Sequence, residues 1–455
     1  MSDYQKFLAS KGHIVNNFGI DPTFMPDGMF DYQKYIAEYM IKKGRCAGYL
    51  DTGTGKTLIE LVLAVNYAKH TNKPVLIMTP LAVAFQFIKE AEKFQIDDIE
   101  YSRDGKHTKK IVVCNYERLH YFDPKNFECV ICDESSILKN CEGATRNAIN
   151  AFLKKIKYRY LLTATPSPNN YEELGTSSEA LGYLGYTDML TKFFKNNEDT
   201  ISPQGIGVEW RLKGHAEDAF FQWVSGWSIS MRKPSDLGFD DSTHVLPELI
   251  VRDHAVKNNK PLIINGQHQM FNIVAKTRSE IAAEQRMTIT QRCELAVELA
   301  QNYDCSVYWC NLNPEGDLVE KLDKNAVQIS GSMKIEKKEE ILLAFYEGQI
   351  KKLVSKAKMT SFGLNWQHCN HTVFFPGFSY EQYYQAVRRF WRFGQTKAVT
   401  VDRVSSDGQV RIIQSLDEKA KKADQLFSKL NASLNKSFEV KATDFSKPIT
   451  LPSFL

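Results

Sequence analysis

One repeated pattern sets the fold class of this chain: short apolar runs alternate with longer amphipathic stretches. In the first half, the apolar runs are bounded by turn residues, as buried strands are. They lie at 46–50, 74–80, 110–115, 128–134 and 158–166. Helical patterns separate them, for example at 57–70 and 82–94. Strands that alternate with helices form a parallel sheet covered by helices, so this half predicts an α/β unit.

The same alternation returns after residue 255, beginning with a helical pattern at 281–302. The apolar runs of this half share the length and the turn boundaries of the first set. They lie at 305–311, 326–330, 351–356, 371–376 and 398–404. A chain of 455 residues is too long for one ordinary core. We therefore predict two α/β halves of similar size.

The stretch between the halves has a different texture, with Trp210, Trp223 and Trp227, few apolar runs and several Gly and Pro breaks. We interpret it as a helical insertion followed by a linker. Tryptophans in such segments pack in a core more often than they stack on bases, and both uses stay open here. The predicted organisation is an extension at 1–29, a first half at 30–183, the insertion and linker at 184–254, a second half at 255–410, and a solvated amphipathic helix and tail at 411–455.

The composition of the chain indicates its cellular compartment more clearly than its function. The net charge of +4 permits a polyanionic partner without arguing for one. The nine cysteines are scattered, which predicts reduced thiols in a cytoplasmic protein. Cys129 and Cys132 have CxxC spacing, but they lie in an apolar run, so core thiols are favoured over a zinc site. The chain begins without a signal-peptide pattern and has no apolar run long enough to span a bilayer, so no membrane partner is expected.

The strongest single motif is LDTGTGKTLIE at 50–60, which follows a predicted strand and opens a helix. In a P-loop, backbone N–H groups wrap around phosphates, helped by the positive end of the helix. Lys56 would reach the β- and γ-phosphates, and Thr57 would bind Mg²⁺. Leu50 stands at the usual first glycine, so the match is incomplete. The ATP-binding residues predicted from this loop are Thr52, Gly53, Thr54, Gly55, Lys56 and Thr57.

A second motif, FECVICDESS, is an apolar strand that ends in two acids. This is the Walker B pattern, in which Asp133 holds Mg²⁺ and Glu134 polarises the attacking water. Two carboxylates at one strand end are needed because metal binding and base action are separate tasks. Taken alone, two adjacent acids would most simply be interpreted as part of an acidic loop on the surface. Their position after a buried strand and downstream of a P-loop favours the catalytic one.

Together with several further motifs, these residues resemble the SNF2-like group of superfamily-2 helicases. DESSILKN at 133–140 resembles that group's acidic box, with Ser136 in place of the DEAH histidine. LLTATPSPNNYEEL at 161–174 is similar to motif III, VLIMTPLAVAFQFIKEAEKF at 75–94 to motif Ia, and VVCNYERL at 112–119 to motif Ib. FDYQ at 30–33 is similar to the Q motif, which implies that Gln33 contacts the adenine.

The second half continues this resemblance. QISGSMKIEKKEEILLAFYEG at 328–348 is similar to the stretch after motif IV, SFGLNWQHCN at 361–370 to motif V, and QAVRRFWRFGQTKAV at 385–399 to motif VI. Arg388 and Trp391 depart from the Asp and His that the family often has. The chain most resembles the compact SNF2-like helicases carried by bacteriophages, some of which act on branched DNA.

The resemblance implies two RecA-like lobes, each a parallel β-sheet flanked by helices, with ATP and Mg²⁺ as cofactors. Arg389 and Arg392 would stabilise the γ-phosphate during hydrolysis, so the catalytic set is Lys56, Glu134, Arg389 and Arg392. Thr163, Thr165 and Gln385 would couple hydrolysis to lobe movement. The expected nucleic-acid contacts are mainly to phosphates, which suits a motor that does not read sequence. They are Thr79, Pro80, Asn115, Tyr116, Ser330, Gly331, Ser361 and Asn365.

The expected function is that of a DNA-dependent ATPase, a helicase or translocase that remodels forked or branched DNA in phage replication, recombination or repair. It would work in the cytoplasm, which is the host cytoplasm if a phage encodes it. Two alternatives remain. One is an RNA helicase, and the other is an ATP-regulated nucleic-acid-binding scaffold with little unwinding.

Overall fold

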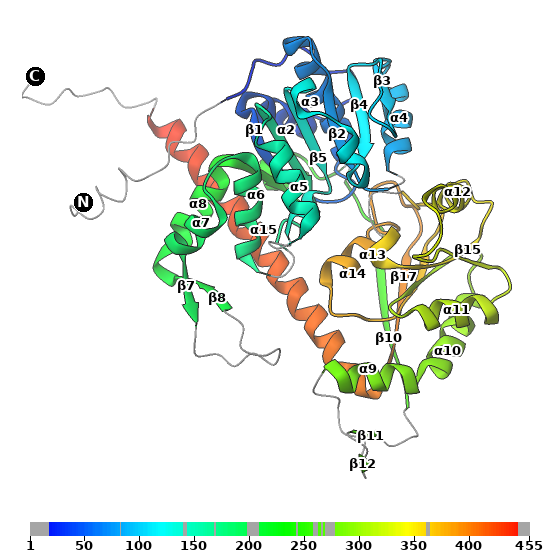
Figure 1. Cartoon of the computed structure of the whole chain (residues 1–455). Coiled ribbons are helices and arrows are strands. Elements are labelled where there is room, and N and C mark those ends of the chain that lie inside the picture. Colours follow the sequence, from blue (N-terminus) through cyan, green and yellow to red (C-terminus); the bar gives the residue numbers. More distant parts are fainter. Residues whose placement is uncertain are drawn as a thin grey trace, which may run out of the picture. The chain divides into compact units, whose positions relative to one another are not determined.

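The computed structural model describes residues 18–81, 83–139, 143–167, 170–197, 209–242, 244–257, 263–264, 267–268, 278–360 and 365–444 (Figure 1). The chain divides into two compact units. Unit 1 is Met1–Met78, Glu90–Asp241 and Ala423–Leu455, and unit 2 is Thr79–Lys89 and Ser242–Lys422. Within the described residues, no helix combines the length and the apolar character needed to cross a bilayer.

The first sheet has seven strands in the order β3-β4-β2-β5-β6-β1-β9. Five of them confirm the predicted runs: β1 (Arg45–Leu50), β2 (Val75–Thr79), β4 (Ile111–Asn115), β5 (Cys129–Asp133) and β6 (Tyr158–Thr163). The pairs β1–β6, β5–β6, β2–β5, β3–β4 and β1–β9 are parallel. The sequence pattern did not indicate β3 (Ile99–Tyr101), because it is a half-buried three-residue strand without an apolar run.

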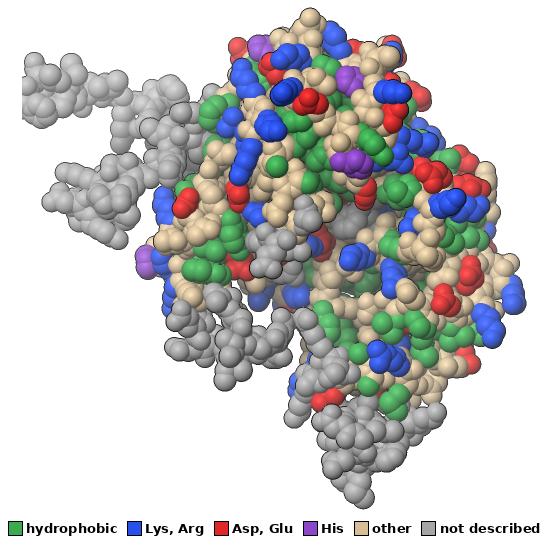
Figure 2. Space-filling model, in the orientation of Figure 1, with side chains coloured by type: hydrophobic (Ala, Val, Ile, Leu, Met, Phe, Trp, Pro, Cys, Tyr) green, Lys and Arg blue, Asp and Glu red, His purple; other side chains and the backbone are tan. Residues whose placement is uncertain are grey.

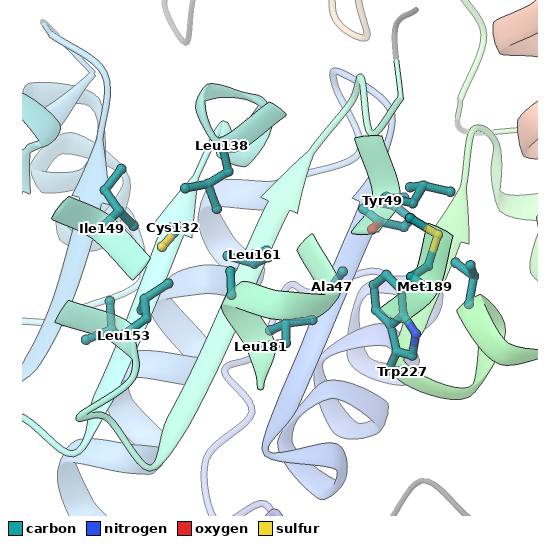
Figure 3. Close-up of a cluster of buried hydrophobic side chains, with 14 of the residues drawn as sticks. Ala47, Tyr49, Cys132, Leu138, Ile149, Leu153, Leu161, Leu181, Met189 and Trp227 are labelled. Carbon is teal, nitrogen blue, oxygen red and sulfur yellow. The ribbon is translucent and has the colours of Figure 1, made fainter. Parts of the chain in front are cut away.

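Helices cover this sheet, as Figure 1 shows. They are α2 (Asp31–Lys43), α3 (Lys56–Thr71), α4 (Ala84–Lys93), α5 (Ala144–Leu153) and α6 (Leu174–Leu181), with short 3-10 turns η1 (Tyr116–Tyr121) and η3 (Ser135–Lys139). One core cluster gathers side chains from the strands and from the helices above them (Figure 3). Cys132 belongs to this cluster. Cys129 lies three residues earlier on the extended strand and therefore points to the opposite face. The two thiols are thus buried on opposite sides of the sheet.

The stretch 184–254, expected to be helical, contains both helices and strands. It forms α7 (Tyr186–Phe193), the antiparallel pair β7 (Phe194–Asn197) and β8 (Glu209–Leu212), α8 (Glu217–Trp227), β9 (Ser228–Met231) and the start of β10 (Leu249–Val256). Its β9 pairs with β1 and so completes the first sheet. Trp223 and Trp227 are buried in the core of unit 1. For these two tryptophans the core-packing interpretation is confirmed, and the segment is an integral part of the fold.

The second sheet has six strands in the order β10-β17-β16-β13-β15-β14, all paired in parallel. The predicted runs appear as β13 (Ser306–Cys310), β14 (Ala326–Gln328), β15 (Lys352–Lys356), β16 (His371–Phe374) and β17 (Val399–Ser406). The accompanying helices are α9 (Arg278–Met287), α10 (Ile289–Gln301), α11 (Asn313–Leu322), α12 (Ile335–Tyr346), α13 (Ala357–Thr360) and α14 (Tyr380–Val387), and β11 (Ile263–Ile264) pairs with β12 (Gln267–His268). Two helix-flanked parallel sheets match the two expected RecA-like lobes.

The C-terminal helix α15 (Val410–Asp444) is amphipathic, as predicted, but one of its faces is buried. Leu426, Phe427 and Leu430 join the core cluster of unit 1. Polar contacts flank them, because Asp424 pairs with Arg232 and Asn431 accepts a hydrogen bond from Ser230 of β9. The final turns of the chain's last described helix are therefore part of unit 1.

Candidate nucleotide-binding site

The loop between β1 and α3 has the backbone of a phosphate-binding loop. Gly53 and Gly55 both have φ of +83°, and α3 begins directly afterwards at Lys56. A Cβ atom on Gly55 would lie 2.1 Å from Nε2 of Gln33, so this position needs glycine both for its backbone angle and for space. N–H groups at the first turn of a helix lack partners within the helix and bind anions.

Lys56 and Thr54 make the internal contacts of this loop. Nζ of Lys56 donates to the carbonyl oxygens of Leu50 at 3.1 Å and Asp51 at 3.3 Å. The Thr54 hydroxyl donates to the carbonyl of Asp51 at 2.7 Å. The lysine thus crosses the open side of the loop and is half-buried there. Its ammonium lies where it can exchange backbone carbonyls for phosphate oxygens.

Gln33 of α2 supports the loop from behind. Its Nε2 donates to the carbonyl of Thr54 at 3.1 Å, and its Oε1 accepts from the backbone N–H of Phe30 at 3.0 Å. The residue is buried. The structure therefore places Gln33 against the P-loop, where it holds the loop's backbone. A contact with adenine stays a prediction.

Asp133, the first acid of the Walker B pattern, is the last residue of β5, and Glu134 follows it directly. In the sheet, β6 lies between β5 and β1, the strand that leads to the P-loop. The strands β5, β6 and β1 are consecutive in the sheet, so the residues at their carboxyl ends gather at one edge. Asp133 and Glu134 are both 5% exposed. Glu134 has φ of +50°, a left-handed conformation that costs a non-glycine residue about 1–3 kcal/mol and is concentrated at functional sites.

Thr163, the last residue of β6, connects the acids to motif III. Its hydroxyl donates to Oε2 of Glu134 at 3.4 Å and accepts from the backbone N–H of Thr165 at 3.1 Å. Both threonines are buried. The predicted coupling residues Thr163 and Thr165 therefore lie within one hydrogen-bonded chain that starts at Glu134.

Sequence reasoning missed a third carboxyl group at this edge, Glu60 of α3. It is fully buried, and burial is the main cause that raises its pKa well above the ordinary value; the negative charge of Asp133 adds to this, and Lys56 opposes it. The raised pKa favours the protonated form of Glu60. The available signal was a single acid within the apolar helical run LIELVLAV.

The residues present fit a nucleotide with Mg²⁺. Thr57 is half-buried in the first turn of α3, and Asp133 supplies a carboxylate at the neighbouring strand end. Mg²⁺ in phosphate-transferring sites uses only one or two protein oxygens and completes its shell with phosphate and water. Among the described residues no group of three or more His, Cys, Asp or Glu side chains could hold a metal alone. This donor set therefore suits a metal that arrives with a phosphate.

The arginines of motif VI lie in unit 2, in the turn that follows α14. The Arg389 side chain is 2% exposed, with Cζ 5.2 Å from the centre of the Trp366 ring. Arg388 lies 4.8 Å from the ring centre of Trp391, so the two departures from the family pattern contact each other. A cation over an indole contributes about 0.5–2 kcal/mol, which accounts for their joint presence.

A glutamine network that sequence reasoning missed joins motif VI to motif V. Nε2 of Gln395 donates to the carbonyls of Gln367 at 3.0 Å and Cys369 at 3.1 Å. The backbone N–H of Trp366 donates to the carbonyl of Arg389 at 3.2 Å. Gln385 of α14, which is one of the predicted coupling residues, is also buried. The two motifs thus share one hydrogen-bonded framework inside unit 2.

The expected nucleic-acid contacts at 79–80 and 115–116 are less accessible than a DNA-binding surface requires. Thr79 and Asn115 are fully buried, and Pro80 is half-buried. Tyr116 is 5% exposed, lies in the core cluster of unit 1, and donates its hydroxyl to the carbonyl of Asp133 at 2.6 Å. Tyr116 is thus a core residue that supports Walker B, and its contact with nucleic acid stays a prediction.

In unit 2, a cavity of about 320 Å³ lies at the carboxyl ends of β13, β14 and β15. The predicted residues Ser330 and Gly331 line it, together with Ser355 and Lys356, which the sequence analysis did not single out. Nζ of Lys338 donates to the carbonyl of Gly331 at 2.9 Å. Ser361 lies outside the described residues. Asn365 is half-buried and accepts from the backbone N–H of Gln367 at 3.3 Å.

Basic side chains do not gather into one broad patch on the face shown in Figure 2, where Lys and Arg are scattered among Asp and Glu. The net charge of only +4 agrees with this distribution. Binding to a polyanion would then rely on a limited number of placed contacts, such as those of the unit 2 cavity.

Comparisons with known proteins match both units. The family described as the res subunit of type III restriction enzymes matches residues 28–168, and the helicase conserved C-terminal domain matches residues 289–394. The solved structure described as the Sulfolobus solfataricus SWI2/SNF2 ATPase core in complex with dsDNA aligns with a TM-score of 0.41 and 19% identity, covering 85% of this chain and 90% of that one.

Two curated relatives are similar to part of the chain. The SWI/SNF-related matrix-associated actin-dependent regulator of chromatin subfamily A-like protein 1 of Xenopus laevis is 29% identical over 150 residues, which are 31% of this chain and 15% of that protein. The human DNA annealing helicase and endonuclease ZRANB3 is 27% identical over 180 residues, which are 35% of this chain and 16% of that protein. The chain thus spans only a small part of the length of these relatives. The chain therefore carries two helicase domains in order on two parallel sheets, and it is similar to proteins of the SNF2-like group of superfamily-2 helicases.

Proposed function

We propose that the protein is a DNA-dependent ATPase that translocates on duplex DNA and remodels forked or branched structures. The observation that carries the proposal is the edge of the first sheet. There the P-loop lysine, the acids Asp133 and Glu134, and Thr163 follow three neighbouring strands. The names of the matched relatives, which refer to DNA annealing and to a helicase, support DNA as the track.

Each residue of this edge has a distinct task in the proposed reaction. Lys56 and the N–H groups of the P-loop bind the triphosphate, and Thr57 and Asp133 would hold Mg²⁺, which would supply positive charge to the phosphates. Glu134 orients and polarises the attacking water. Because Glu134 is held by Thr163, a change at motif III moves the group that acts on water. Hydrolysis and movement are thereby linked through one hydrogen bond.

Arg389 and Arg392 supply positive charge to the γ-phosphate in the transition state. Arginines of this kind contribute about 10³–10⁵ in rate. Arg389 shares the framework of motif V through the bond between its carbonyl and Trp366. A strand bound at motif V can therefore influence the position of the arginine, which is the basis for stimulation by DNA. Ser330, Gly331 and Lys356 at the unit 2 cavity would contact backbone phosphates.

The first experiment measures ATP hydrolysis with linear duplex, forked DNA, a four-way junction, single strands and RNA. We expect the highest rates with duplex or branched DNA, and products on gels that show remodelled branches. A strong preference for RNA would replace the proposal with an RNA helicase. Hydrolysis that no nucleic acid stimulates would favour an ATP-regulated binding scaffold.

Site variants test the chemistry in the same assay. Glu134→Gln should bind ATP and lose turnover by about 10²–10⁴, the usual contribution of a general base. Arg392→Ala should bind ATP but lose most DNA-stimulated turnover, whereas the exposed Arg411→Ala serves as its control. Lys56→Ala should weaken both binding and turnover. Normal hydrolysis by Lys56→Ala and Glu134→Gln would overturn the site assignment.

The resemblance to compact phage-carried helicases extends the proposal to replication, recombination or repair of phage DNA in the host cytoplasm. Branched DNA arises in all three processes. Activity on a four-way junction would support such a role, and activity restricted to linear duplex would argue for translocation alone.

A further inference from the structure

Two cysteines far apart in the sequence meet at the edge of the second sheet. Cys305 directly precedes β13, and Cys369 lies two residues before β16. The strands are parallel neighbours, with Val307 opposite Thr372, so the residues that precede them are brought side by side. The Cys369 thiol donates to the carbonyl of His371 at 3.4 Å, and Cys305 packs against the core cluster that contains Cys369.

The two thiols have different surroundings. Cys369 is fully buried, whereas Cys305 is half-buried and reaches solvent. The neighbouring side chains of Cys369 and His368 and the charge of Lys351 lower the pKa of Cys305 to about 6, against the opposing effect of burial. Burial raises the pKa of Cys293, in the same unit, to about 12. The lowered pKa of Cys305 favours its thiolate, which is the nucleophilic form.

Cys369 belongs to a loop that is bonded to the motif VI segment. Its carbonyl accepts from Nε2 of Gln395 at 3.1 Å, and its backbone N–H donates to the carbonyl of Trp366 at 3.0 Å. The backbone N–H of Trp366 in turn donates to the carbonyl of Arg389 at 3.2 Å. A displacement of Cys369 is therefore transmitted to the segment that carries Arg389.

We propose that Cys305 and Cys369 form a peroxide-sensitive thiol pair, which closes to a disulfide and ties the loop at 366–370 to β13. The oxidant is hydrogen peroxide or an organic hydroperoxide. The Cys305 thiolate attacks one peroxide oxygen, the O–O bond breaks, and a sulfenic acid and hydroxide form. The Cys369 sulfur then attacks the Cys305 sulfur, the S–O bond breaks and water leaves. Two thiols and one hydrogen peroxide give one disulfide and two waters.

Disulfide formation is tested directly on the full chain. The reduced protein is treated with hydrogen peroxide, and its cysteines are mapped by alkylation and mass spectrometry. We expect a Cys305–Cys369 disulfide that dithiothreitol reverses. The rate at which iodoacetamide modifies Cys305 should rise with a midpoint near pH 6. Oxidation of Cys305 no faster than that of Cys293, or over-oxidation while Cys369 stays a thiol, would overturn the pair.

Variants separate the two sulfurs. In Cys369→Ser, Cys305 should stop at a sulfenic acid that dimedone captures, and Cys305→Ser should form no disulfide. Cys293→Ala is the matched control and should form the disulfide as the parent does. Thermal unfolding of each variant checks that it is folded. If Cys369→Ser unfolds, the parent and Cys305→Ser still decide the question by mapping.

The effect on turnover rests on the proposed ATPase function. Oxidation should slow DNA-stimulated hydrolysis several-fold in the parent, reversibly, and leave Cys305→Ser unchanged. A disulfide in a protein without ATPase activity in either state would sink the proposed function but not the thiol pair. If the protein is an active ATPase but peroxide treatment produces no Cys305–Cys369 disulfide, the proposed thiol pair is refuted. A disulfide that leaves turnover unchanged would refute transmission through the loop at 366–370.

Discussion

The hydroxyl of Thr163, at the end of β6, donates a hydrogen bond to Oε2 of Glu134, at the end of β5, across a distance of 3.4 Å. The strands are neighbours in the sheet, so a shift of either strand end changes this contact. The same hydroxyl accepts from the N–H of Thr165. The bond therefore connects the proposed water-activating group to motif III.

Removal of this hydroxyl should slow hydrolysis without preventing nucleotide binding. In Thr163→Val, turnover should fall roughly ten- to hundredfold, because a hydrogen bond to a charged group contributes about 1.5–3 kcal/mol. Steady-state ATPase rates and nucleotide titrations measure the two effects. The control is Thr191→Val, at an exposed helical threonine whose hydroxyl donates to the carbonyl of Thr187 in the same helix. Equal rates for Thr163→Val and the parent would contradict a role in turnover.

Gly55→Ala should damage the P-loop by two mechanisms. Alanine at φ of +83° costs about 1–2 kcal/mol, and its Cβ would meet Nε2 of Gln33 at 2.1 Å. We expect weaker ATP binding and a lower thermal midpoint, with partial recovery when Gln33→Ala is added. Gly214→Ala, where no atom lies within 4 Å, should change neither quantity. No recovery in the double variant would show that backbone strain alone is responsible.

Glu60→Gln should stabilise the nucleotide-free protein at neutral pH. In the unfolded chain Glu60 ionises near 4.5, whereas burial raises its pKa in the folded state. Above pH 4.5 the folded state therefore holds more protons, and its stability falls as pH rises. Glutamine cannot ionise, so the advantage of Glu60→Gln should grow between pH 5 and pH 8, an interval chosen to lie above that value.

Urea unfolding at several pH values without Mg²⁺ measures this difference. The exposed Glu92→Gln in α4 is the control and should show no such trend. A Glu60→Gln variant whose stability relative to the parent does not depend on pH would mean that Glu60 is ionised in the folded protein.

The docked face of α15 should contribute strongly to unit 1. Phe427 is 3% exposed within the core cluster, and Arg232 lies 4.4 Å from its ring centre. Phe427→Ala should cost about 3–5 kcal/mol, the usual loss for a buried phenylalanine. Calorimetry should show a lower midpoint for the transition of unit 1, and the exposed Lys421→Ala should show none. An unchanged midpoint would mean that α15 is not docked in solution.

Much of this protein was decided within short stretches of sequence. The apolar runs bounded by turn residues became β1, β2, β4, β5 and β6, and LDTGTGKT became a P-loop, because strand burial and glycine backbone freedom act over a few residues. The order of the motifs along the chain was sufficient to indicate two parallel sheets, and the residues predicted for the nucleotide-binding site stay a prediction.

Other features depended on partners that are distant in the sequence. Only packing decided that β9 would complete the first sheet, that Tyr116 would support Asp133 from the core, and that Glu60 would be buried with a raised pKa. The contact between Cys305 and Cys369 likewise exists only because β13 and β16 are neighbours. Local patterns state what a segment can form, but burial, pKa and side-chain partners are set by whichever surfaces the folded chain brings together.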